Sequence, residues 1–372
     1  MKMNKWTVGL AAAGVVSLSS VAQAQEAAAN AVQTKLATTS LSGYVSTSFN
    51  WVAGDDTGAQ TGYRLGDAEN DQFSLDVISL SLGSPAGSGE WATGYNVQLW
   101  LGPDASALGV GAADESAAVK NAYIELRVPV GSGLDLQVGR FDTIIGYEGI
   151  DYNNNPFFSH SWGYAIQPTL HTGVKATYQV AEEVSVSAIV ANTHEANDNE
   201  GADNDSRKTY GFAATIGAPD SMGFLSDAEL TVGYISGRET TGADDIQNLY
   251  IGASLPTPIT DLSAGITYDV RDEGGVGGAA SVLGIYLAYK VNDQMTVNAR
   301  FEKVEEGGTP SGAAELINTS NADAIDLTLG VDYAIWDGVK TRAEWRQTHV
   351  DDQSTATDAV TNALLFNIIY EF

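Results

Sequence analysis

The chain has 372 residues, 44% of them hydrophobic, and a formal net charge of −29. A surface this acidic repels nucleic acid and attracts cations. The chain contains no cysteine, which excludes disulfide frameworks, zinc–thiolate sites and cysteine nucleophiles.

The first 24 residues have the pattern of a signal peptide. Lys2 and Lys5 are positive, residues 8–18 form a short apolar run, and Ala22-Gln23-Ala24 is a small-residue cleavage site. The apolar run is too short to span a membrane as a helix. We therefore expect a signal peptide at 1–24, an Ala-rich polar leader at 25–40, and a folded domain at 41–372.

From Ser40 onward the chain becomes a series of runs of about ten residues, in which apolar and polar side chains alternate. Sixteen such runs are found, at 41–52, 72–83, 90–101, 119–129, 133–142, 170–180, 183–192, 207–217, 226–236, 246–255, 260–270, 280–291, 293–303, 323–335, 338–349 and 361–372. The connections between them are alternately long and short, as in transmembrane barrels. This regularity predicts an all-β protein, a transmembrane antiparallel β-barrel of about 16 strands.

Charged residues occupy every second position in several runs. Arg342, Glu344 and Arg346 alternate with Ala343 and Trp345. Such charges are too costly to face lipid near the bilayer midplane, so we expect them to face a wet lumen. A soluble sheet with one solvated face would also alternate, but it would not require the alternation of connection lengths.

The last run is apolar on one face and ends at Phe372. Such an end is similar to the assembly signal of bacterial outer-membrane barrels, so we expect outer-membrane lipid and the barrel assembly machinery as partners. Aromatic residues near strand ends are predicted to form the membrane-interface girdle, at Trp51, Trp91, Trp336 and Phe372. The second run changes phase between Val77 and Ile78, which predicts a bulge or a miscounted strand there.

Residues 143–169 form the third long connection and do not alternate. The stretch is rich in aromatic residues, whereas disordered loops are poor in them, and it contains the turn-forming run Asn153-Asn154-Asn155-Pro156. Long loops in compact domains are usually functional or disordered. We therefore expect a folded insert that packs against the inside of the barrel.

The stretch from Gly139 to Gly173 resembles the OmpL-like family of outer-membrane beta-barrel porins. The resemblance is carried by GRFDTIIGYE (139–148), an Asn- and aromatic-rich segment ending at Ser159, and Pro168 with His171-Thr172-Gly173-Val174. It covers about 35 residues tightly and implies an outer-membrane channel with no particular solute. Homotrimer formation is an expectation from general porins alone.

By analogy with general porins, the third long loop is expected to enter the barrel and set the constriction of a passive diffusion channel. Charge and diameter at such a ring determine selectivity. The candidate constriction consists of loop acids facing basic wall residues, namely Asp142, Glu148, Asp151, Arg127, Lys175, Lys340, Arg342 and Arg346. The acid excess predicts a preference for cations among small hydrophilic solutes or ions.

Three alternatives stay open. The acidic run 195–205 (EANDNEGADND) suggests calcium, although it lacks the spacing of an EF-hand. A hydrolase on the outer wall would need partners for His171, and Asp142 with Glu148 would be the acid pair of a glycosidase. No catalytic motif is present, so we predict no catalytic residue, no metal and no cofactor. A non-conducting structural barrel or adhesin is the third alternative.

Overall fold

The computed structural model describes residues 38–54, 71–106, 108, 116–195, 207–238, 244–274, 278–307, 322–352 and 357–372. The predicted signal peptide and most of the leader lie outside these ranges, as does nearly all of the acidic run 195–205. The described helical segments are short: α2 (Pro103–Ser106), η3 (Tyr152–Asn154), α3 (Trp162–Ala165) and η5 (Asp220–Leu225). In the described part of the chain, no helix is both long and apolar enough to cross a membrane.

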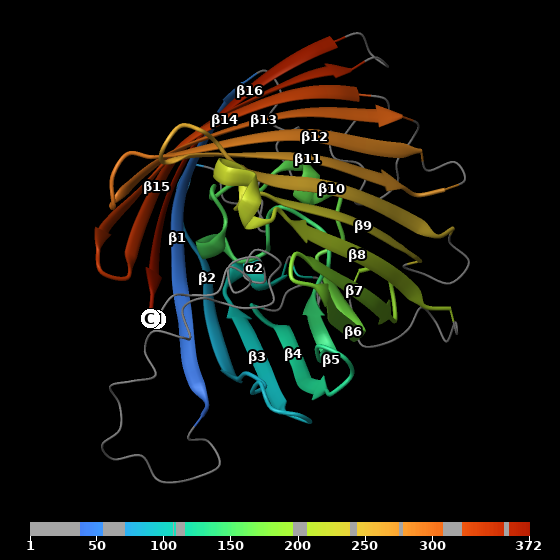
Figure 1. Cartoon of the computed structure of the whole chain (residues 1–372). Helices are drawn as coiled ribbons and strands as arrows, with labels where there is room; N and C mark the ends of the chain where they lie inside the picture. The colour runs from blue at the N-terminus through green and yellow to red at the C-terminus, as the bar shows by residue number, and fades with distance from the viewer. Residues whose placement is uncertain are drawn as a thin grey trace.

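The described strands form one closed antiparallel barrel (Figure 1). They are β1 (Ser40–Gly54), β2 (Gln72–Ser84), β3 (Thr93–Leu101), β4 (Ala117–Val128), β5 (Leu134–Asp142), β6 (Leu170–Ala181), β7 (Val184–Ala191), β8 (Thr209–Gly217), β9 (Glu229–Gly237), β10 (Ile246–Pro256), β11 (Leu262–Asp272), β12 (Ala279–Lys290), β13 (Met295–Gly307), β14 (Ala322–Trp336), β15 (Val339–Asp352) and β16 (Thr357–Glu371). The prediction of sixteen strands is confirmed, and each run coincides with a strand to within four residues at either end.

The barrel closes where the first strand meets the last. β1 pairs with β16, with Phe49 opposite Phe366 and Trp51 opposite Leu364. The backbone of Phe372 continues this seam, because Phe372 and Gly43 exchange two N–H···O bonds of 3.0 Å. Closure therefore leaves the described strands without an exposed sheet edge. The unpaired backbone groups of such an edge would find no hydrogen-bond partner in lipid.

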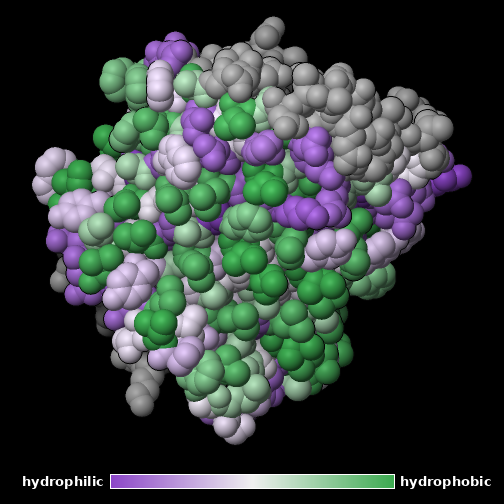
Figure 2. Space-filling model, turned by 90° about the horizontal axis from the view of Figure 1, so that it is seen from above, coloured by the Kyte–Doolittle hydropathy of each residue, from purple (hydrophilic) through white to green (hydrophobic). Residues whose placement is uncertain are grey.

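The two faces of each strand differ as the alternation predicts. In β14, Ile325 and Leu329 are exposed on the outside, whereas Asp326 and Thr328 are completely buried on the inside. The same division recurs around the barrel, and Figure 2 shows a broad apolar area of the outer surface bordered by hydrophilic residues. The apolar outside is the surface that lipid contacts.

The irregularity expected in the second run is a bulge. The pairing of β1 with β2 shifts register between Ser46 and Thr47, so that Asp76 is the extra residue of the bulge in β2. Asp76 and Val77 are consequently both buried, which changes the phase of the strand. Asp76 accepts hydrogen bonds from Ser46 (2.7 Å) and Ser48 (2.6 Å) on the inner face of β1.

Candidate functional site

Residues 143–169, here called loop 3, connect β5 to β6 and fold inside the ring of strands (Figure 1). Side-chain bonds within the loop define its shape. Asn155 closes a turn by accepting from the Gly149 N–H at 2.9 Å and donating to the Gly149 carbonyl at 2.7 Å. Ser161 caps α3 by accepting from the Tyr164 N–H at 3.0 Å. Loop 3 thus has a defined conformation of its own.

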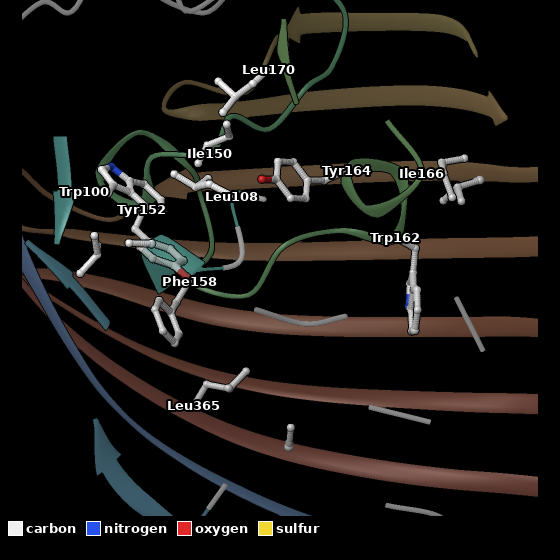
Figure 3. Packing of buried hydrophobic residues seen from close by; sticks show 14 of the residues in the cluster. Trp100, Leu108, Ile150, Tyr152, Phe158, Trp162, Tyr164, Ile166, Leu170 and Leu365 are labelled. Carbon is white, nitrogen blue, oxygen red and sulfur yellow. The ribbon is translucent and has the colours of Figure 1, made fainter. Parts of the chain in front are cut away.

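The aromatic residues of loop 3 pack against the barrel interior. Tyr152, Phe158 and Trp162 are fully buried, and Tyr152 stacks on Trp100 of β3 with ring centroids 6.2 Å apart. Figure 3 shows Tyr152 beside Trp100, and Phe158 on the side of Leu365 from β16. The expected packing of the aromatic insert against the inside of the wall is therefore observed.

Wall carboxylates accept the backbone N–H groups of loop 3. Glu344 of β15 accepts from the backbones of Phe158 and Ser159, the latter at 3.1 Å. Glu302 of β13 accepts from the Trp162 N–H at 2.8 Å. These charge-assisted bonds satisfy backbone donors that would otherwise be buried without a partner.

Arg300 of β13 is the centre of the same contact and has no exposed surface. Its Nη1 lies 2.8 Å from Oε1 of Glu148 and donates to the Ser159 carbonyl at 2.9 Å. Its Nη2 donates to the His160 carbonyl at 3.3 Å. Tyr286 of β12 donates a further hydrogen bond to Glu148, at 3.1 Å. We call the contact of Arg300 with Glu148 and its neighbours the latch.

Two of the predicted basic wall residues also hold loop 3. Arg342 donates to the carbonyls of Tyr152 and Asn155, and Arg346 donates to the His160 carbonyl at 2.7 Å. Both guanidinium groups are nearly inaccessible to solvent. Arg342 and Arg346 therefore contact the backbone carbonyls of loop 3, whereas the predicted constriction placed them opposite its carboxylates.

The Glu148 carboxylate lies in the latch and does not face open space. Its side chain is fully buried, which differs from the expectation that all three loop acids face the lumen. Burial by itself would raise the pKa of Glu148, but the Arg300 guanidinium, with His160 after it, holds that pKa at about 2. Burial lowers the pKa of His160, so that this neighbour stays neutral. Glu148 consequently remains ionised at neutral pH.

The other two acids share one wall lysine. Lys120 of β4 lies 2.8 Å from Asp142 Oδ1 and 3.0 Å from Asp151 Oδ2. Gln98 and Tyr44 donate to Asp151 Oδ1 at 2.8 and 3.0 Å. The side chains of Asp142 and Asp151 keep 25% and 17% of their surface exposed, whereas Lys120 keeps 1%. The two carboxylates thus present negative charge to solvent while the lysine lies behind them.

A cavity of about 550 Å³ lies between loop 3 and the end of the barrel that carries the short connections. The strand ends next to the short connections contribute mainly hydroxyl and amide side chains to its lining, and loop 3 forms the opposite side. In the described part of the chain, its charged lining residues other than Glu148 are Asp142, Asp151, Glu229, Asp332, Lys175 and Lys340. Water and polar solutes therefore meet more acids than bases here.

Three of the predicted basic residues have different surroundings. Lys175 donates weakly to the Asp142 carbonyl, at 3.4 Å, and Lys340 donates to the Asn153 carbonyl at 3.0 Å. Arg127 lies next to a short connection and pairs with Asp135 at 2.9 Å, remote from loop 3 in the strand register. The structure therefore brings Lys175 and Lys340 to loop 3 but does not bring Arg127 there.

Sequence reasoning missed the most important contacts of the loop. Glu344 was expected only to face the lumen, and Arg300, Glu302 and Lys120 were not among the candidate site residues. Their strand positions indicate that they have partners, because charges that point inward on adjacent strands are paired when a loop buries them. The identity of the partner follows only from how loop 3 lies, which the alternation of the strands does not specify.

The closed sixteen-stranded barrel with an inserted third loop defines the class of outer-membrane porins. The family model described as putative beta-barrel porin-2, OmpL-like, matches residues 38–372. The chain belongs to this family, as the resemblance implied, and it is a porin channel of the bacterial outer membrane. No curated protein matches the chain in sequence.

Several solved structures have the same fold at low sequence identity. The outer membrane channel DcaP of Acinetobacter baumannii is 11% identical with a TM-score of 0.62, covering 90% of this chain and 97% of that chain. Salmonella typhi OmpF in complex with daunomycin is 12% identical, with a TM-score of 0.59 and coverage of 90% and 94%. The anion-selective porin from Comamonas acidovorans is 14% identical, with a TM-score of 0.57 and coverage of 90% and 99%.

Proposed function

We propose that this porin is a passive diffusion channel for small hydrophilic solutes or ions, with a preference for cations. The observation that carries the proposal is the polar cavity beneath loop 3. Of the charged residues that line it and are not locked in the latch, four are acids and two are lysines: Asp142, Asp151, Glu229, Asp332, Lys175 and Lys340. An excess of acids at a narrow aqueous passage raises the local concentration of cations.

The proposed role is tested by single-channel recording of the refolded mature protein in a planar bilayer with a salt gradient. We expect stable open steps and a reversal potential on the cation side. Steps with a reversal potential near zero or on the anion side would support the channel function and refute the cation preference. An absence of steps from protein shown to be folded would favour a structural barrel.

A hydrolase is not favoured by the surroundings of the histidine that was considered for it. His171 is completely buried, and its Nε2 lies 3.1 Å from the Thr143 hydroxyl at the base of loop 3. It therefore does not face the outer wall. Asp142 and Glu148 have separate basic partners, Lys120 and Arg300, and the Glu148 side chain is fully buried.

Assembly is part of the proposal. One matched OmpT structure of Vibrio cholerae is described as a trimer form, and we propose a homotrimer in outer-membrane lipid, inserted through recognition of Phe372. Deleting Phe372 also removes a pair of backbone bonds to Gly43 at the seam. We expect this deletion to lower the amount of folded trimer in outer membranes, measured by unheated gel electrophoresis against total protein. Unchanged trimer would contradict the proposed recognition.

A further inference from the structure

The inward-facing side chains of strands β7, β8 and β9 change from polar to apolar along the length of the strands. Near the short connections it presents hydroxyl groups, with Thr215 and Thr231 hydrogen-bonded at 2.9 Å and Ser187 bonded to the neighbouring strand β6. Farther along the same inward face come Ile189 of β7 and Ile235 of β9, both essentially inaccessible to solvent. The wall of the wet cavity thus gives way to an apolar surface.

Two wall glycines make room at this level. Gly211 of β8 is paired with Ile189 on one side and Ile235 on the other. A Cβ on Gly211 would lie 2.8 Å from Cγ1 of Ile189 and 2.9 Å from Cγ1 of Ile235, so the two isoleucines close over it. A Cβ on Gly233 of β9 would overlap Cγ2 of Ile145 from loop 3. A side chain at Gly233 would therefore keep loop 3 away from this wall, and one at Gly211 would displace the two isoleucines.

Loop 3 fills that space with Ile145, which has only 5% of its surface exposed to solvent. Ile145 belongs to one buried apolar cluster with Ile189, Ile235, Phe141 and Tyr250. The cavity beneath loop 3 is lined by Ile145 and Tyr250 but by neither wall isoleucine. This cavity therefore ends where Ile145 meets the wall.

We infer that Ile145, Ile189 and Ile235, here called the isoleucine collar, form the solute-selecting contact of the channel. Ile145 is the specificity-determining residue, because passage along the β7–β9 wall requires its side chain to part from Ile189 and Ile235. This inference rests on the proposed diffusion function, and it names the collar as the contact that limits diffusion. The collar admits small hydrated solutes only while it is parted, and it excludes those too wide to pass Ile145.

The two sides of loop 3 differ in how firmly they are held. Toward β13 and β15 the loop is fixed by Arg300, Arg342, Arg346 and wall carboxylates. Toward β7 and β9 the contact of Ile145 is purely apolar. An apolar contact has no directional bonds to break, and narrow apolar constrictions control passage through wetting and drying. The collar, rather than the latch, is therefore the side that opens.

A cysteine pair tests the inference directly, because the chain contains no cysteine. Cγ2 of Ile145 is one bond of about 1.5 Å from its Cβ, so the Cβ atoms at positions 145 and 233 lie within about 4 Å of each other. That distance suits a disulfide. In the double variant Ile145→Cys, Gly233→Cys, we expect oxidation to lower single-channel conductance about fivefold or more and reductant to restore it.

Three controls make the result decisive. Ile145→Cys alone should not respond to reductant, and Ile145→Ala should increase the permeability to wider neutral sugars in liposome swelling. Ile266→Ala, on the exposed outer face of β11, should leave both readouts unchanged. A double variant shown to be cross-linked and folded, yet conducting equally when oxidised and reduced, would overturn the collar. A wild-type channel without conductance would instead refute the diffusion function.

Discussion

Replacing Arg300 with methionine is expected to release loop 3 from the wall of the barrel. The substitution leaves the Glu148 carboxylate buried without its guanidinium partner. The Ser159 carbonyl loses its Arg300 donor, and the His160 carbonyl keeps only its bond from Arg346. Breaking a buried ion pair by removing one partner costs about 3–5 kcal/mol. Glu148 then moves toward water and carries the loop with it. We expect a lower thermal unfolding midpoint together with a severalfold larger and noisier single-channel conductance.

The matched control is Arg127→Met, which removes an arginine from the partly exposed pair with Asp135. Exposed pairs contribute only about 0–1 kcal/mol, so stability and conductance should stay close to those of the wild type. If Arg300→Met behaves like this control, the latch does not hold loop 3. The comparison separates the loss of a positive charge from the loss of the latch.

The pH dependence of stability provides a second readout of the same latch. The folded-state pKa of Glu148, about 2, lies below its ordinary value of 4.5. Ionised Glu148 therefore contributes stability that is fully present above pH 4.5 and is lost as the pH falls toward 2, about 3 kcal/mol in total. The difference in unfolding midpoint between the wild type and Glu148→Gln should shrink over this window. A constant difference would show that the carboxylate charge is not what holds the loop.

Neutralising Asp142 and Asp151 together is expected to reduce the cation preference strongly. Both carboxylates are partly exposed at the cavity, and their shared partner Lys120 lies behind them with almost no exposed surface. Asp142→Asn with Asp151→Asn removes two negative charges and leaves the lysine uncompensated. The reversal potential in a salt gradient should move toward zero or to the anion side. Charge and field at the narrow part of a pore set its ion preference.

Adding Lys120→Met to this double variant restores part of the original charge balance. The triple variant should therefore recover part of the cation preference and should also remove the cost of a buried, unpaired ammonium group. Asp135→Asn, an exposed acid at the short-connection end, should shift the potential much less. An unchanged reversal potential in the folded double variant would show that these acids do not control the pore.

The strands could be predicted almost completely because membrane barrels impose a strict physical rule. Lipid accepts only apolar side chains near its centre, so the inside and outside positions of β14, from Ile325 to Asp332, can be assigned from alternation alone. The bulge in β2 was also predicted, but the adjacent residues that share a face are Asp76 and Val77 rather than Val77 and Ile78. The prediction of loop 3 as a packed insert followed from aromatic residues that could not remain in water at such density.

The partners of loop 3 could not be predicted in the same way. Alternation places Arg300 and Arg342 on the inside but does not say whether they face water, a carboxylate or a backbone carbonyl. In loop 3, most acceptors of these two arginines are carbonyl groups, which every residue carries and which leave no mark in the sequence. The collar was missed for a related reason, since Ile145 and Gly233 are ordinary residues until the fold makes them neighbours.

The latch also has a consequence for the order in which the barrel is built. Loop 3 precedes its partners by a long stretch of chain, with Trp162 and Glu302 separated by 140 positions and Ser159 and Glu344 by 185. Contacts this distant form late, because their loop-closure entropy must be overcome first. A growing sheet that lacks β13–β15 offers loop 3 its contacts with the earlier strands, such as that of Asp151 with Lys120, but not those with Arg300, Glu302 and Glu344. Loop 3 is therefore latched only when the final strands arrive, and until then it is held by the earlier strands alone.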